Sequence, residues 1–324
     1  MEKLWNCPPA VEEAKASQKG LHWALEILIF LAVFAVCTFG EILLSLPVQM
    51  GLLLRDPDYQ DALENGDILR IDEAVNRVVN SDTNMMISLF VTAAMIGIVF
   101  LFCRLIQKRT LSSLGFVRRG FAKEYAKGVC LGFAMFSAAA GICVLTGSLS
   151  FSYAPKGFSP AVFLLFTAGY MVQGMAEEVL CRGYFLVSVG RRYPMSAAVL
   201  FNSCAFAALH LLNPGISPLA VANLILFGIF ASICFIRTEN IWLVGAVHSV
   251  WNLVQGNVYG GNVSGMKTSC SIFSAAAADG REIFHGGEFG LEGGIAVTVV
   301  LLAAILLLLF WKHNNQRESA MEEV

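Results

Sequence analysis

The sequence predicts an all-α fold, a polytopic transmembrane helical bundle with about eight spans. Of its 324 residues, 56% are hydrophobic and 14% are charged, and the mean hydropathy is +0.66. An ordinary soluble domain has about 25% charged residues. The apolar residues also form long runs, and a helix needs about 20 such residues to cross about 30 Å of hydrocarbon. We therefore expect an integral membrane protein.

Each expected span is an apolar run bounded by charged or turn-forming residues. The spans are 23–46, 85–106, 127–147, 160–187, 194–212, 217–236, 240–257 and 293–311. The first run is too long for a signal-peptide core, so we expect a retained helix. Residues 1–125 would hold two spans with an acidic outer loop and a basic cytoplasmic connector. Residues 126–257 would form the core membrane domain (spans 3–7), and 258–324 an outer loop, the last span and a short cytoplasmic tail.

Basic residues predict the orientation, because cytoplasmic loops are enriched in Lys and Arg. The connector between the second and third spans is rich in them. If this connector is cytoplasmic, both termini lie inside the cell, and we expect this topology in the cell membrane. The net charge of −2 gives no indication of a nucleic-acid partner. Nothing in the sequence indicates an oligomeric state.

The connectors differ in composition. Residues 55–84 are acidic and are expected to hold a short amphipathic helix, whereas 109–127 mix basic and apolar residues, which is typical of an interfacial helix. Residues 258–292 are rich in Gly and Ser and are expected to form a flexible loop. No internal repeat suggests the duplicated halves that are common in transporters.

Ionisable residues inside the spans are costly and therefore informative. In the fourth span, Glu178 and Arg182 are separated by four residues, the spacing of a helical ion pair. Glu177 lies about 100° around the helix and is poorly placed to share that arginine. A carboxylate without a cationic partner in an apolar site can act as a general base near neutral pH. Glu26 and Glu41 in the first span are expected to be structural or near an interface.

Two further spans carry polar residues at helical spacing. His248 and Asn252 share one face of the seventh span, and Phe206 and His210 share one face of the fifth. Each residue alone has a structural explanation, since a buried ion pair, a packed histidine or an interhelical amide bond is common in membrane proteins. Their confinement to three helices makes the group a stronger candidate site than any member.

These residues resemble the signature of the CAAX protease and bacteriocin-processing family of intramembrane proteases, which includes type II CAAX prenyl endopeptidases and proteins like lysostaphin-resistance protein A. The family pattern is EExxxR, then FxxxH, then HxxxN/D. The matching residues are Glu177, Glu178 and Arg182, then Phe206 and His210, then His248 and Asn252. The resemblance covers 160–257, about a third of the chain.

The resemblance implies a helical bundle around a water-filled cavity, in which Glu177 activates water. It implies that His210 helps to hold water or substrate and that Glu178 and Arg182 maintain the shape of the site. His248 and Asn252 would polarise the scissile carbonyl and stabilise the oxyanion. The implied activity is endopeptidase cleavage of a membrane-associated or prenylated CAAX-type protein or peptide.

A metal requirement stays open at the level of sequence. The family is commonly labelled metalloprotease, and zinc, if present, would be bound by Glu177, His210 and His248. A glutamate-activated water needs no ion, and the helix with the glutamates lacks the HExxH arrangement. The expected partners are a membrane-associated substrate and membrane lipids. The alternatives are a non-catalytic scaffold that regulates a partner protein and a proton-coupled transporter, because Glu and His chains in spans also form proton relays.

Overall fold

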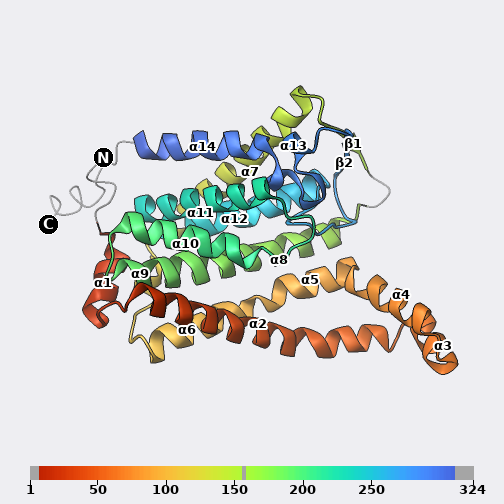
Figure 1. Cartoon of the computed structure of the whole chain (residues 1–324), viewed down its shortest axis with the longest axis horizontal. Coiled ribbons are helices and arrows are strands. Elements are labelled where there is room, and N and C mark those ends of the chain that lie inside the picture. Colours follow the sequence, from red (N-terminus) through yellow and green to blue (C-terminus); the bar gives the residue numbers. More distant parts are fainter. Residues whose placement is uncertain (1–6, 155–157, 311–324) are drawn as a thin grey trace.

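The computed structural model describes residues 7–154 and 158–310, and it confirms the all-α prediction (Figure 1). The longer helices lie roughly side by side along the long axis of the molecule. In the first half of the chain the helices are α1 (Pro9–Ser17), α2 (Trp23–Leu53), α3 (Pro57–Asn65), α4 (Ile68–Val79), α5 (Asp82–Val91), α6 (Ala93–Leu105) and α7 (Phe121–Leu145). In the second half they are α8 (Pro160–Glu178), α9 (Val187–Gly190), α10 (Met195–Leu209), α11 (Pro218–Thr238), α12 (Trp242–Leu253), α13 (Glu282–His285) and α14 (Ile295–Phe310).

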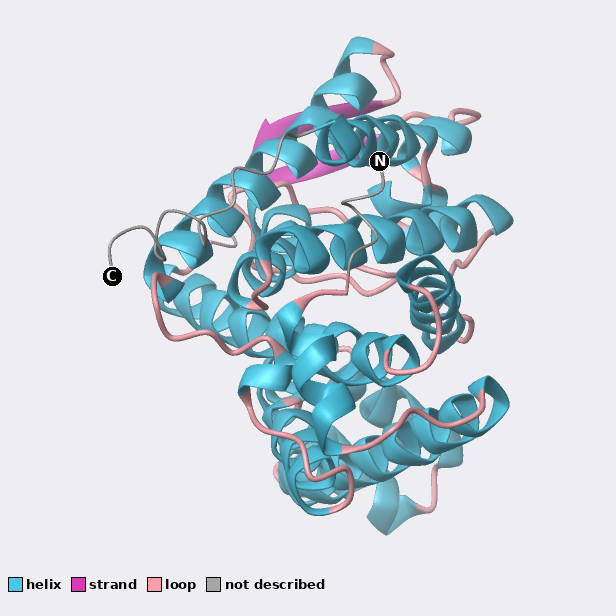
Figure 2. Ribbon diagram, turned by 90° about the vertical axis from the view of Figure 1, so that its left-hand side faces the viewer, coloured by secondary structure: helices cyan, strands magenta, loops and turns pink. Residues whose placement is uncertain are grey.

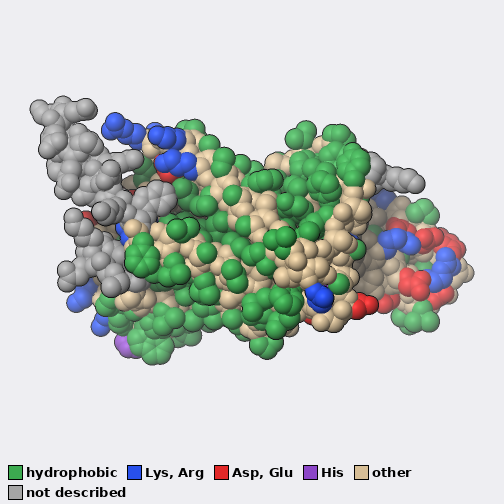
Figure 3. Space-filling model, turned by 90° about the horizontal axis from the view of Figure 1, so that it is seen from above, with side chains coloured by type: hydrophobic (Ala, Val, Ile, Leu, Met, Phe, Trp, Pro, Cys, Tyr) green, Lys and Arg blue, Asp and Glu red, His purple; other side chains and the backbone are tan. Residues whose placement is uncertain are grey.

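Each predicted span corresponds to helix in the structure. Within the described part of the chain, four helices are long and apolar enough to cross a membrane: α2, α5 together with α6, α7 and α11. Helices α10 and α14 are apolar but shorter. Apolar side chains cover the body of the molecule, and charged groups gather at its two ends (Figure 3). This distribution is that of an integral membrane bundle.

The fourth and seventh spans pass through π-helical turns next to their polar residues. Helix α8 continues as a π-helix at Val179–Leu186 before α9, and α12 continues as one at Val254–Val258. The first begins directly after Glu178, and the second begins two residues after Asn252. Turns of this kind occur mostly at functional sites, because they displace the backbone from regular helix geometry.

Helix α12 packs closely against two neighbours through small residues. A Cβ added at Gly128 of α7 would lie 2.3 Å from the Leu243 carbonyl oxygen, and one at Gly174 of α8 would lie 2.5 Å from the Ser249 hydroxyl. Small residues let membrane helices approach at backbone distance. These contacts hold α12 between α7 and α8 and so place its polar residues inside the bundle.

The acidic connector is helical, as predicted, but it forms two helices, α3 and α4. Asp56 and Asp67 begin them by accepting hydrogen bonds from backbone amides in the first turn of each. The two helices extend beyond one end of the bundle (Figure 1). Exposed ion pairs, Asp61 with Arg70 and Asp56 with Arg77, link one helix to the other.

The prediction of an interfacial helix within 109–127 is wrong. This connector contains only a short 3₁₀ helix, Ser112–Leu114, before α7 begins at Phe121. Its first arginine, Arg109, is turned inward and is 1% exposed. Its guanidinium donates to the carbonyl oxygens of Ser113 and Gly183, each at 2.8 Å, and burial lowers the pKa of Arg109 to about 10. The irregular backbone of the π-helical turn supplies such acceptors, which an interfacial helix would not reach.

The segment 258–292 is packed against the bundle, contrary to the expectation of a flexible loop. Its strand β2 (Phe273–Ala277) pairs antiparallel with β1 (Leu149–Tyr153), with Phe151 opposite Ala275. Figure 2 shows the two strands together at one edge of the helices. Two 3₁₀ turns, Gly287–Phe289 and Leu291–Gly293, precede α14. Gly and Ser here permit close packing, since a Cβ at Gly286 would lie 1.9 Å from a backbone oxygen.

The chain ends lie outside the described residues. These ends comprise 1–6 and 311–324, and they include the predicted cytoplasmic tail and the last residue of the eighth span. The N-in, C-in topology stays a prediction.

Candidate active site

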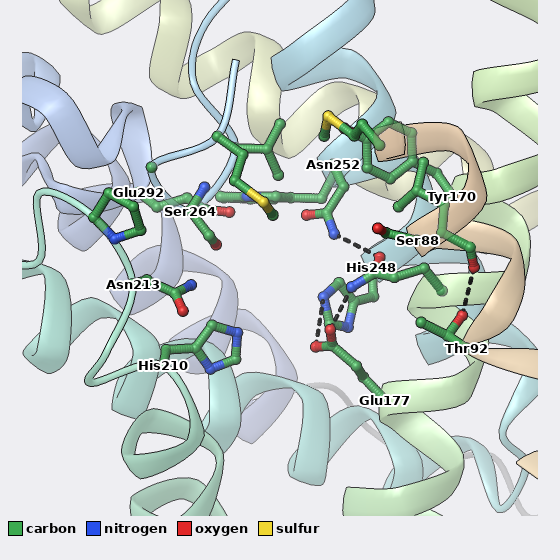
Figure 4. Close-up of a pocket in the computed structure, with 18 of the residues that line it drawn as sticks. Ser88, Thr92, Tyr170, Glu177, His210, Asn213, His248, Asn252, Ser264 and Glu292 are labelled. Carbon is green, nitrogen blue, oxygen red and sulfur yellow. Dashed lines mark hydrogen bonds and ion pairs between the residues drawn. The ribbon is translucent and has the colours of Figure 1, made fainter. Parts of the chain in front are cut away.

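A cavity of about 570 Å³ lies between the helices that carry the polar motifs. Glu177, His210, His248 and Asn252 line it, together with Phe206 (Figure 4). Other walls come from α2, α5, α11, the segment 263–267 and the start of α14. The structure therefore places the predicted polar residues of three helices around one cavity.

Glu178 and Arg182 form the ion pair that their spacing predicts. Arg182 Nη1 lies 2.8 Å from Glu178 Oε1, and both side chains are fully buried. The guanidinium also lies over the ring of Phe206, 4.8 Å from its centroid. A buried carboxylate with its own cation and no place in the cavity lining is suited to hold the site together.

Glu177 faces the cavity, away from that pair. Its side chain is 22% exposed, and its Oε2 lies 3.6 Å from His248 Nε2. It also accepts a hydrogen bond from the Gln173 side chain, one helical turn earlier. The structure thus separates the two adjacent glutamates as the helical geometry predicts.

His248 lies between the two glutamates. Its Nδ1 is 2.8 Å from Glu178 Oε1, so an Nδ1–H donated to Glu178 leaves Nε2 directed at Glu177. The ring is 5% exposed and packs edge-on against Phe227, with 5.0 Å between centroids. Because its orientation is held on both sides, His248 can present Nε2 to a group bound in the cavity.

Asn252 is linked to Glu177 through a residue without a predicted role. Its Nδ2 donates to Gln173 Oε1 at 3.0 Å, while the amide nitrogen of Gln173 donates to Glu177. Gln173 therefore sets the positions of both side chains from one turn of α8. Its separation of four residues from Glu177 was a usable signal, whereas its contact with α12 was not readable from the sequence.

His210 lies on the other side of the cavity. It ends α10, and its Nδ1 is 2.8 Å from the Phe206 carbonyl oxygen. Figure 4 shows it across the cavity from Glu177 and His248. The structure thus brings Glu177, His248 and Asn252 together on one wall and places His210 opposite them.

The residues in this arrangement do not fit the zinc ligand set. Among residues 7–154 and 158–310, no three His, Cys, Asp or Glu side chains are grouped so as to hold a metal ion. His248 Nδ1 is held by Glu178, and His210 stands across the cavity. We derive no step through a metal.

Two acidic residues of the cavity come from outside the motifs. Glu292, before α14, is 9% exposed, and its Oε2 accepts hydrogen bonds from Ser264 N at 3.1 Å and Oγ at 2.9 Å. Burial raises the pKa of this carboxyl. Glu26 and Glu41 were both expected to be structural or near an interface. Glu26 forms a buried ion pair with Arg191 at 3.2 Å, whereas Glu41 of α2 lines the cavity.

Residues 159–254 match the family model described as type II CAAX prenyl endopeptidase Rce1-like. The match covers 96 of the 324 residues. No curated protein and no solved structure matches the chain. The Rce1-like segment begins at the N-cap of α8 and ends two residues after Asn252, so it contains every residue of the three motifs. Helices α1 to α7 and the chain after 254 lie outside it. At the level of the family, this likeness supports a CAAX-type intramembrane protease.

Proposed function

We propose that the protein is an intramembrane endopeptidase in which Glu177 activates a water molecule. One observation carries the proposal: the Glu177 carboxylate faces a cavity beside His248, while its neighbour Glu178 is buried with Arg182. The acid without a paired cation is therefore the one directed into the cavity. A carboxylate in that position can take a proton from water.

The reaction needs only groups of this wall. Glu177 would remove a proton as the water oxygen bonds to the scissile carbonyl carbon, and the oxyanion forms. It would then return that proton to the leaving amine nitrogen as the C–N bond breaks. In this reaction His248 carries a proton on both ring nitrogens. Its Nε2–H and the second N–H of Asn252 Nδ2 donate to the oxyanion, each typically worth about 3–4 kcal/mol. None of the motif residues is a Ser or Cys nucleophile, so no covalent intermediate is required.

The remaining residues have positioning roles in this proposal. Glu178 orients His248, and Arg182 balances the charge of Glu178. Gln173 keeps Glu177 and Asn252 in one arrangement. His210, across the cavity, is placed to hold the substrate or the water, and Phe206 packs between His210 and the Arg182 guanidinium.

The substrate class follows the family. A prenylated or otherwise membrane-associated CAAX-type protein or peptide would enter the cavity from the bilayer, with membrane lipids around the bundle. We place the protein in the cell membrane with both termini inside. The apolar surface of the bundle and the Rce1-like match support a membrane location, and the basic connector after the second predicted span supports the orientation.

The test is cleavage of a farnesylated peptide that ends in a CAAX sequence, by protein reconstituted in liposomes. Glu177→Ala should lower the cleavage rate about 10²–10⁴-fold, the usual contribution of a general base. Glu64→Gln, on exposed α3, is the control and should cleave like the wild type. Full cleavage by Glu177→Ala would refute the mechanism. If the wild type cleaves nothing, the scaffold alternative is favoured.

A further inference from the structure

One wall of the cavity is built by helices outside the Rce1-like segment. Glu41 of α2, Asn84 and Ser88 of α5, and Thr92 between α5 and α6 line it. Figure 4 shows Ser88 and Thr92 on the same side of the cavity as Glu177 and opposite His210. Gln49 Nε2 donates to Asn84 Oδ1 at 2.9 Å and so ties α2 to α5. The wall is therefore a fixed part of the bundle.

Glu41 lies in the middle of the long apolar helix α2. Its neighbours Phe39, Ile42 and Leu43 are 50–61% exposed on the outside of the bundle, where lipid surrounds them. A carboxyl at this depth costs about 2.5–3.5 kcal/mol on insertion scales and is rare without a purpose. Glu41 Oε1 is buried and has no hydrogen-bond partner among the described residues. Because Glu41 lines the cavity, this carboxyl can interact with a molecule that binds there.

Three acids line the cavity: Glu41, Glu177 and Glu292. The basic side chains of the lining are Lys267, His210 and His248, and His248 is held between Glu177 and Glu178. Lys267 is the only Lys or Arg among the described lining residues, and its side chain is exposed. Elsewhere in the bundle, the buried acids Glu26 and Glu178 each have an arginine. No Lys or Arg among the described residues forms an ion pair with Glu41, which leaves this acid available to a cation that a ligand brings.

We propose that Glu41 binds a cationic group of the substrate, an ammonium or a guanidinium next to the scissile bond, and thereby makes the cavity selective for basic peptides. This inference rests on the proposed function. A desolvated carboxylate and a cation attract each other far more strongly than they do in water. Because Glu41 shares the cavity with Glu177, a cation between them would also relieve the repulsion of the two acids.

The charge of the surface near one end of the cavity also favours a cationic substrate. Val79, Asn80 and Ser81, where α4 meets α5, line the cavity at the end that carries α3 and α4. Figure 3 shows acidic side chains gathered on this end of the molecule with a few basic ones among them, and residues 55–84 hold eight Asp or Glu against three Arg. A surface of net negative charge raises the local concentration of a cationic substrate.

The experiment uses the purified full chain in lipid bicelles and peptides that differ at one position. Each peptide carries Lys, Met or Glu at one position within two residues of the cut. Every peptide is made in two forms, with a free and with an acetylated N-terminus. Cleavage is followed by mass spectrometry. The wild type should prefer Lys over Met about tenfold or more. Glu41→Gln, which keeps the side-chain shape, should lower kcat/KM for the Lys peptide about 10–100-fold more than for the Met peptide.

Two further arms sharpen the result. Glu41→Lys should reverse the preference towards the Glu peptide, and Glu64→Gln should leave the wild-type preference unchanged. A preference that acetylation removes identifies the α-ammonium as the cation, whereas one that survives acetylation identifies a basic side chain. Thermal unfolding of each variant shows that it is folded.

The failures of the two proposals are distinguishable. Cleavage that needs Glu177 but shows equal rates for Lys and Met peptides overturns the role of Glu41 and leaves the protease intact. If no peptide is cleaved, the Kd values of the Lys and Met peptides for the wild type and Glu41→Gln decide. Equal affinities overturn the inference, and a Lys preference that Glu41→Gln removes supports a cationic ligand without proteolysis.

Discussion

Removing Arg182 should destabilise the bundle strongly, because its charge partner has no route to water. Both Arg182 and Glu178 are 0% exposed, and their atoms are 2.8 Å apart. Arg182→Met keeps most of the side-chain volume but leaves a buried carboxylate that is hydrogen-bonded only to His248 among the described side chains. Loss of one member of a buried pair costs about 3–5 kcal/mol. At about 2 °C per kcal/mol for a chain of this size, the Tm should fall by about 6–10 °C.

The assay is thermal unfolding in detergent, read with a thiol-reactive dye. Buried cysteines, among them Cys103, Cys181 and Cys234, become reactive only when the bundle opens. The control is Arg70→Met, because the Arg70–Asp61 pair is as short, at 2.6 Å, but is about half exposed. Solvent screens such a pair, so its loss should leave the Tm unchanged within error.

A double variant separates charge from packing. In Arg182→Met with Glu178→Gln, no unpaired carboxylate is left, and the glutamine oxygen can still accept from His248 Nδ1. The double variant should therefore unfold at a higher temperature than Arg182→Met alone. A Tm for Arg182→Met within 2 °C of the wild type (about 1 kcal/mol) would refute the reasoning, as would a double variant less stable than the single one.

Two other predictions use the same unfolding assay. Gly128→Ala should lower the free energy of unfolding by about 1–3 kcal/mol, since the new Cβ would lie 2.3 Å from the Leu243 oxygen. Gly141→Ala on the same helix is the control, because its Cβ would meet open space and should not destabilise the protein. Equal effects of the two substitutions would contradict the close packing. Burial raises the pKa of Glu292, so the folded protein binds this proton more tightly than the unfolded chain, in which Glu titrates at about pH 4.3. Wild-type stability should therefore fall relative to Glu292→Gln as pH rises above about 4.3, and parallel pH curves would contradict this.

Local helical geometry made part of the site readable in advance. Glu178 and Arg182 meet because residues four apart share a helix face, and Glu177 points elsewhere for the same reason. His248 and Asn252 likewise reach one wall from one face of α12. The connector that turned inward at Arg109 was misread, because its acceptor, the Gly183 carbonyl, belongs to a helix 74 residues away.

The sequence by itself determined the helical membrane bundle and the polar faces of single helices, because apolar run length and the helical repeat are properties of a short stretch of chain. Only the tertiary structure decided which faces meet. Gln173 bonds to Asn252 because Gly174 lets α8 approach α12, and Glu41 joins the cavity because α2 packs beside α5. Such contacts depend on many small packing interactions between segments that are distant in the sequence, so no local sequence pattern predicts them.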